Sequence, residues 1–133
     1  MNEIILPSSD GSDYLKLTSF RPEPNGVSFE IQVSSRNFSG QTSYALEAIE
    51  FRSLIDNLQH MYDTLSGMAE MRLHMEEDHI NFKINPSGQV LVSGVLIHYK
   101  EPLHNLKFGF YSDQTCLPSF IQALSHVGNT IGK

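Results

Sequence analysis

Six histidines offer the residue type that most often ligates a metal or transfers a proton near neutral pH. They are His60, His74, His79, His98, His104 and His126. The densest set of potential ligands is segment 74–79, which reads His-Met-Glu-Glu-Asp-His. If His74 lies in a strand, its side chain points to the opposite face of the sheet from that of Met75, and His79 lies beyond a turn. The spacing therefore does not place the two imidazoles on the same face, where they could bind one metal ion. We therefore predict no metal site, and we keep an enzyme pocket near His74 and His79 only as an alternative.

Acid–base catalysis by two carboxylates needs a pair of acids held close together in different environments. Glu47 and Glu50 are close in sequence, but acids in the first turn of a helix are favoured by the helix dipole, and we interpret both as helix caps. The chain contains no glycine-rich phosphate loop, zinc-protease motif or nucleophile elbow. Ser, His and Asp are plentiful, and a hydrolytic triad is defined by geometry and not by sequence spacing, so the sequence gives no evidence for or against one. We predict no catalytic residue and no cofactor.

The composition indicates one ordinary globular domain spanning residues 1–133. Cys116 is the only cysteine, which excludes an internal disulfide, and we interpret it as a small buried apolar residue. The first residues lack a basic segment followed by a long apolar run, and no apolar stretch could span a bilayer. We therefore expect a soluble, cytoplasmic protein without a secretory signal.

The net charge of −6 is concentrated in the middle of the chain. Residues 47–78 contain eight acids and two bases. The six surplus acids of this segment account for the whole net charge of the chain. Such a bias argues against nucleic acid or an anionic membrane as the partner, because both require clustered Lys and Arg. It allows a basic protein partner, although acidity that serves only solubility is the simpler alternative.

The clearest structural pattern lies in residues 44–67, where apolar residues recur three and four positions apart, as on one face of an α-helix. These residues are Phe51, Leu54, Ile55, Leu58, Met61, Tyr62 and Leu65. We predict a long helix here that is capped by Gly67, and residues 41–46 are also compatible with a strand that leads into it. A second helix is predicted to begin near Pro118 and to continue toward Ile131.

Alternating apolar and polar residues predict strands in the remaining chain. Their predicted ranges are 3–6, 14–20, 27–34, 41–46, 71–76, 80–85, 89–99 and 106–111, with a break possible at Gly94. The first is short and ends at Pro7, and we expect residues 1–12 to form a flexible N-terminal segment. The connecting turns have hairpin length, so the fold class is α+β: a mainly antiparallel, twisted sheet of seven or eight strands with one long central helix and one C-terminal helix. We find no internal sequence repeat.

Several of these segments together resemble a known family. The segments are residues 46–51, 54–58, 88–94, 106–110 and 113–121. Their order is similar to that in small bacterial proteins of the WapI-type immunity family, over roughly residues 27–127. The resemblance lies in core and turn positions, and it implies a protein that neutralises a toxin made by the same bacterium and has no active site.

We therefore expect an immunity protein that binds a basic toxin domain stoichiometrically through an acidic surface. The residues expected to contact the toxin are Glu50, Asp56, Asp63, Glu76, Glu77 and Asp78. The alternative is an interaction subunit that forms a homo-oligomer or a complex with no antitoxin role.

Overall fold

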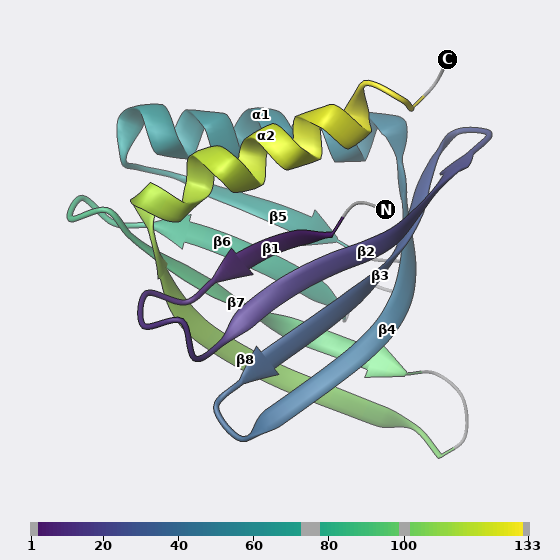
Figure 1. The fold of residues 1–133 in the computed structure, drawn as a ribbon, viewed down its shortest axis with the longest axis horizontal. Helices are drawn as coiled ribbons and strands as arrows, with labels where there is room; N and C mark the ends of the chain where they lie inside the picture. Colours follow the sequence, from purple (N-terminus) through teal and green to yellow (C-terminus); the bar gives the residue numbers. More distant parts are fainter. Residues whose placement is uncertain (1–2, 73–77, 99–101, 132–133) are drawn as a thin grey trace.

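Two successive units with the same order of elements make up the fold (Figure 1). The computed structural model describes residues 3–72, 78–98 and 102–131. The first unit contains β1 (Ile4–Pro7), β2 (Tyr14–Glu23), β3 (Gly26–Ser35), β4 (Phe38–Glu47) and helix α1 (Ala48–Thr64). The second contains β5 (Met68–Arg72), β6 (His79–Ile84), β7 (Gln89–His98), β8 (His104–Asp113), the 3-10 turn η1 (Gln114–Cys116) and helix α2 (Leu117–Gly128).

Each unit forms its own antiparallel sheet, with its four strands in sequence order. Val27 is opposite Leu46 in the first sheet, and Val92 is opposite Phe110 in the second. The predicted fold class, with eight antiparallel strands and two helices in the described part of the chain, is confirmed. The strands form two sheets and not the single sheet that was predicted: β4 and β5 are connected through α1, and they are the last strand of one sheet and the first strand of the other.

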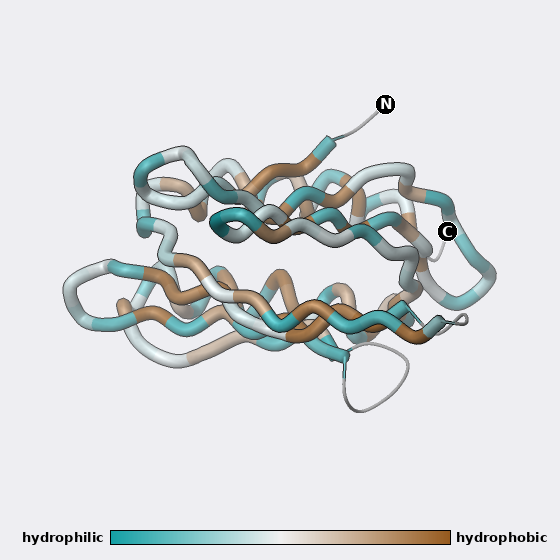
Figure 2. Tube along the Cα trace, turned by 90° about the horizontal axis from the view of Figure 1, so that it is seen from below, coloured by the Kyte–Doolittle hydropathy of each residue, from teal (hydrophilic) through white to brown (hydrophobic). Residues whose placement is uncertain are grey.

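The two sheets lie over one another in two layers, and β4 approaches β7 while β3 approaches β8 (Figure 2). One face of each sheet is buried, as shown by Phe29 and Ile31 on β3 and by Phe82 on β6. The two helices lie side by side, and each packs on the first strand of the other unit: α1 on β5 and α2 on β1. This exchange of helices joins the two units into one hydrophobic core.

The long helix begins at Ala48, four residues after the start of its predicted range. Tyr44 and Leu46 are buried and alternate with more exposed neighbours, because they still belong to the ladder between β4 and β3. The predicted capping role of Glu47 and Glu50 is confirmed, since the two form a capping box in which the Glu47 N–H donates to the Glu50 carboxylate at 3.0 Å.

The predicted apolar stripe of this helix is largely confirmed. Phe51, Leu54, Leu58 and Met61 are buried, whereas the side chain of Tyr62, at the margin of the stripe, is 39% exposed. The predicted cap at Gly67 is wrong by two residues. Leu65 adopts the left-handed conformation, with φ 53°, and its N–H donates to the Met61 carbonyl at 2.8 Å.

Strand β7 runs through Gly94 without a break, so the alternative of an interrupted strand is wrong. A Cβ at Gly94 would collide with the His79 carbonyl oxygen, so the glycine allows β6 to come close there.

The short strand expected near the N-terminus is present as β1, and Pro118 lies in the first turn of α2 as predicted. Neither helix in the described part of the chain is long and apolar enough to cross a membrane.

Candidate functional site

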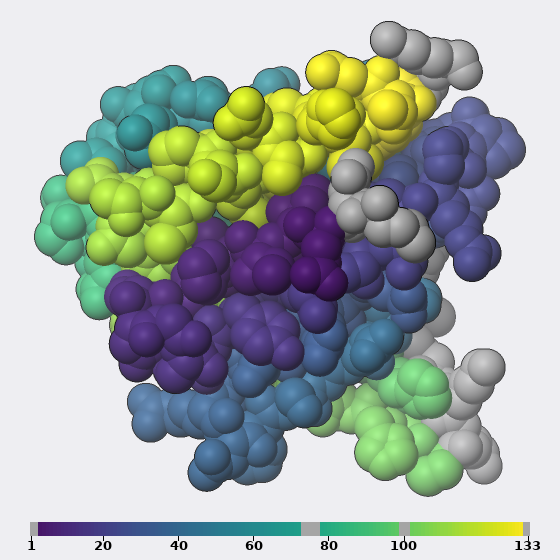
Figure 3. Space-filling model, viewed as in Figure 1, coloured from purple at the N-terminus to yellow at the C-terminus, as the bar shows by residue number. Residues whose placement is uncertain are grey.

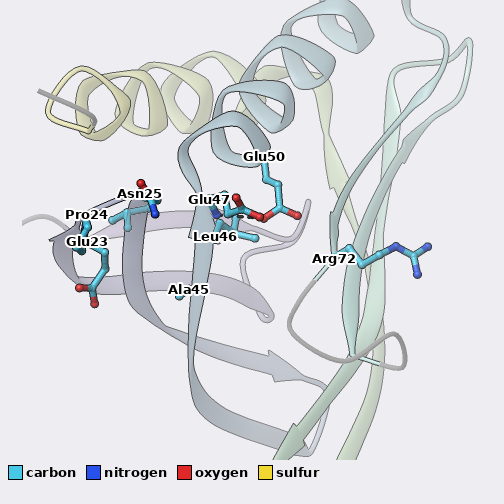
Figure 4. Close-up of a pocket in the computed structure, with 10 residues that line it drawn as sticks. Glu23, Pro24, Asn25, Ala45, Leu46, Glu47, Glu50 and Arg72 are labelled. Atoms are coloured by element: carbon cyan, nitrogen blue, oxygen red, sulfur yellow. Dashed lines mark hydrogen bonds between the residues drawn. The ribbon is translucent and has the colours of Figure 1, made fainter.

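A groove opens beside the first turn of α1, and we refer to it as the acidic groove (Figure 4). Its main cavity has a volume of about 460 Å³ and is lined by the β2–β3 turn, the end of β4, the start of α1 and Arg72 at the end of β5. A smaller cavity of about 200 Å³ adjoins it and shares Leu46, Glu50 and Arg72 with it. The two cavities together form one continuous depression between the first sheet and the second.

Carboxylates dominate the polar lining of the acidic groove. They are Glu23, Glu47, Glu50 and Glu70. Among the residues that the structure describes, Arg72 is the only base lining either cavity, and its guanidinium lies 3.0 Å from the Glu70 carboxylate. Its side chain points away from Glu47 and Glu50 in Figure 4. The groove therefore carries net negative charge and suits a cationic group such as a Lys or Arg side chain.

Apolar groups complete the lining on the side of the smaller cavity. Leu46 and Met71 are buried at its base, and Ile49 is 72% exposed on the adjacent helix turn. An exposed apolar residue next to carboxylates can contact the aliphatic part of a long basic side chain while the acids contact its charge.

Local hydrogen bonds hold the walls of the acidic groove in place. The N–H of Ala48, the first residue of α1, donates to the Asn25 carbonyl at 2.8 Å, which fastens the β2–β3 turn to the helix. Gly26 lets β3 approach β4, because a Cβ there would collide with the Leu46 carbonyl oxygen. The turn, the strand end and the helix start are thus fixed relative to one another.

The structure places the predicted contact residues in different surroundings. Glu50 lines the groove, whereas Asp56 and Asp63 are exposed farther along α1 and line neither of its cavities. Asp56 and Asp63 are seven residues apart and share one helix face, and Asp63 accepts a hydrogen bond from Gln59 at 3.0 Å. Asp78 is fully buried, so it is not part of the surface of the free protein. Glu76 and Glu77 lie outside the described residues.

Three acids of the groove were absent from the predicted contact residues: Glu23, Glu47 and Glu70. The sequence does show the local charge of Glu47 and Glu70, which belong to the acidic middle of the chain. Glu23, the last residue of β2, lies more than 20 residues before Glu47 in the sequence. It comes close to the start of the helix because Glu23 is opposite Gly26, and Gly26 is opposite Glu47. No local pattern in the sequence could have shown that contact.

The other residues with potential chemistry do not converge. In the part of the chain that the structure describes, no three His, Cys, Asp or Glu side chains are grouped so that they could hold a metal ion. His79 lies on β6, half-buried, while His74 lies outside the described residues. Cys116, which was predicted to be buried, is only half-buried, although it packs against the core.

Comparison with known proteins gives one family and one related fold. A protein-family model described as "Immunity protein WapI-like family" matches residues 7–131. No curated protein matches the chain. A solved structure described as "Crystal structures of trypanosoma bruciei MRP1/MRP2" is similar with a TM-score of 0.51 and 12% sequence identity, over 97% of this chain and 85% of that chain. At that identity the likeness concerns the fold alone.

The match to the family covers almost the whole described chain and both units of the fold. It also contains the segments on which the sequence resemblance was based, and the predicted family is thereby confirmed. This chain belongs to the WapI-like immunity protein family.

Proposed function

We propose that this protein is a bacterial, cytoplasmic immunity protein that neutralises a toxin by binding it stoichiometrically, without catalysis, through the acidic groove. Family membership supports a toxin as the partner. The observation that carries the choice of surface is the gathering of four carboxylates from three separate parts of the chain around the two adjoining cavities of the groove. A basic toxin domain is the partner of matching charge.

Asp56 and Asp63 extend the acidic surface along the exposed side of α1. They lie beyond the groove, so their expected contribution is attraction at longer range, which accelerates encounter more than it strengthens the bound complex. Asp78 has no place in this surface because it is buried.

Charge changes in the groove test this proposal. Glu23→Lys reverses a charge at the exposed turn, and Glu50→Gln removes a charge while its amide oxygen can still accept the capping hydrogen bond from Glu47. Both variants should slow association with a toxin domain found among the neighbouring genes, by roughly threefold to tenfold at low salt. The difference from the wild type should shrink at about 0.5 M salt, where exposed charges are screened.

Glu3→Lys is the matched control for Glu23→Lys, because it makes the same charge change at an exposed residue that does not line the groove and is ion-paired only with Lys16, at 3.6 Å. Its association rate should stay close to that of the wild type. Stopped-flow or surface plasmon resonance measurements give the rates. If Glu23→Lys and Glu50→Gln bind as fast as Glu3→Lys at low salt, the toxin does not use the acidic groove.

A further inference from the structure

Two of the four outer strands of the sheets pack against a helix, and a third is partly occupied by hydrogen bonds. The outer strands are β1, β4, β5 and β8. Helix α2 lies alongside β1, as Figure 3 shows, and α1 packs against β5. The edge of β8 is partly occupied, because the Ser9 N–H donates to the Tyr111 carbonyl and the Ser35 hydroxyl donates to the Gly109 carbonyl, each at 2.9 Å.

Strand β4 packs against β7, and the Tyr44 hydroxyl is hydrogen-bonded to the main chain of Ile97. At its outer edge, however, no backbone–backbone hydrogen bond joins Gln41 or Ser43 to another described segment outside the ladder with β3. The Leu46 carbonyl is directed at β3, since a Cβ on Gly26 would collide with it. Main-chain groups alternate in direction along a strand, so the N–H and C=O groups of Gln41 and Ser43 point away from the sheet.

The sequence of β4 also lacks the features that usually protect an open edge. Natural edge strands are protected by Lys, Pro, bulges or short length. Residues 38–46 contain no charged residue and no proline, Glu47 at the end of β4 is its one charged residue, and the register with β3 is unbroken along the strand. Strand β8, in contrast, carries Lys107. An edge with these properties is a suitable place for a strand of another chain to add.

A cavity lies beside each end of this edge. The acidic groove adjoins Ala45 and Glu47 at one end. A separate cavity of about 340 Å³ adjoins residues 39–42 at the other, between β4 and the ends of β7 and β8. Three carboxylates line the first cavity, whereas the described residues that line the second are polar, apolar or histidine. Among the described residues, the acids therefore gather at one end of the edge.

We propose that the toxin adds an extended segment to β4 as a fifth strand of the first sheet, with a Lys or Arg side chain of that segment in the acidic groove. This inference rests on the proposed function and specifies how the partner binds. Main-chain hydrogen bonds would supply affinity, and the two flanking cavities would select side chains. A second copy of this chain fits less well, since β4 itself contains no Lys or Arg to meet the carboxylates.

Hydrogen exchange followed by NMR tests this mode of binding, with an inactive form of a toxin domain found among the neighbouring genes as the probe. The outward amides of Gln41 and Ser43 should exchange rapidly in the free protein and at least about tenfold more slowly in the complex. Tight binding with unchanged exchange along β4 would overturn the inference and leave the proposed function intact. Absence of any binding would overturn both.

Self-association is a further outcome of the same measurement. If exchange along β4 in the free protein slows as its concentration rises, and sedimentation shows a dimer, the edge pairs with a second copy. That result would also overturn the inference, because the occupant would not be the toxin.

A pair of variants at one position separates main-chain from side-chain effects. Ser43→Pro removes an outward N–H and spares the ladder to β3, while Ser43→Ala keeps the N–H and is the control. We expect Ser43→Pro to bind the toxin domain at least about tenfold more weakly than Ser43→Ala. Equal affinity of the two folded variants would overturn the inference. If Ser43→Pro does not fold, as judged by circular dichroism, the exchange measurement on the wild type decides.

Discussion

At the scale of single residues, the role of each acid depends on what it contacts. Glu50 caps α1 and lines the groove, Glu70 pairs with Arg72, and Asp78 is buried. Sequence reasoning found the concentration of charge and the capping pair correctly, because both depend on neighbours a few positions away. It could not separate buried from exposed acids, since burial depends on strands far away in the chain.

Asp10 illustrates how a local network fixes a carboxylate in its charged form. It accepts hydrogen bonds from the Ser12 hydroxyl at 2.7 Å, the Ser12 amide at 3.0 Å and the Ser8 hydroxyl at 2.8 Å. These donors lower the pKa of Asp10 from its ordinary value of 3.8 to about 2. Ionised Asp10 therefore stabilises the turn at neutral pH, and this contribution is lost as the pH falls through about 2.

Replacement of this carboxylate should have a pH-dependent effect on stability. Asp10→Ala should be less stable than the wild type at pH 7, and the difference should narrow as the pH falls from about 4 toward about 2. Urea unfolding at a series of pH values measures it. Ser12→Ala, which removes only the hydroxyl donor, should show a smaller effect of the same sign. A gap between Asp10→Ala and the wild type that stays constant down to pH 2 would contradict this explanation.

At the scale of elements, periodicity located nearly every helix and strand, and the errors lie at their ends. The stripe from Phe51 to Met61 predicted α1 correctly because side chains on a helix repeat every three or four residues. Its start was placed too early, because Tyr44 and Leu46 fit a helical stripe and an alternating strand equally well. Its end was placed too late, because Leu65 adopts a conformation that usually belongs to glycine.

Two glycines of the second sheet give a matched test of strand packing. Ala at position 94 would collide with the backbone of His79 and Ile80, whereas the nearest atoms to a Cβ at Gly109, on the next strand, lie at 3.7 Å and 3.8 Å. Gly94→Ala should therefore destabilise the fold by about 1–3 kcal/mol. Gly109→Ala should change stability by less than about 1 kcal/mol.

Thermal or urea unfolding of the two variants provides the comparison. Equal stability of Gly94→Ala and Gly109→Ala would mean that β6 can move away from β7 at little cost. The close approach of these strands would then not be the reason for a glycine at position 94.

At the scale of the whole molecule, the fold is a repeat of topology without a visible repeat of sequence. The sequence analysis predicted the strands and helices but not their division into two sheets, because alternation shows which face of a strand is buried and not which strands pair. The packing of α1 on β5 and of α2 on β1 could not be predicted from the sequence either, because α2 and β1 lie in opposite halves of the chain.

The same long-range arrangement creates the candidate site. Glu23, Glu50 and Arg72 meet only because the two sheets and the start of α1 converge at one place. The sequence could predict an acidic protein and, through its segments, the family, and the match over residues 7–131 confirms that family. The shape of the groove required the assembled sheets.

Titration shows whether this protein neutralises a toxin by stoichiometric binding. Purified protein is added in steps to an active toxin domain found among the neighbouring genes, and the remaining toxin activity is measured together with the mass of the complex. Stoichiometric neutralisation predicts that activity falls linearly and reaches its minimum at one protein per toxin. Undiminished activity with excess protein would contradict it, as would complete loss of activity at a small fraction of one equivalent, which would indicate catalytic inactivation.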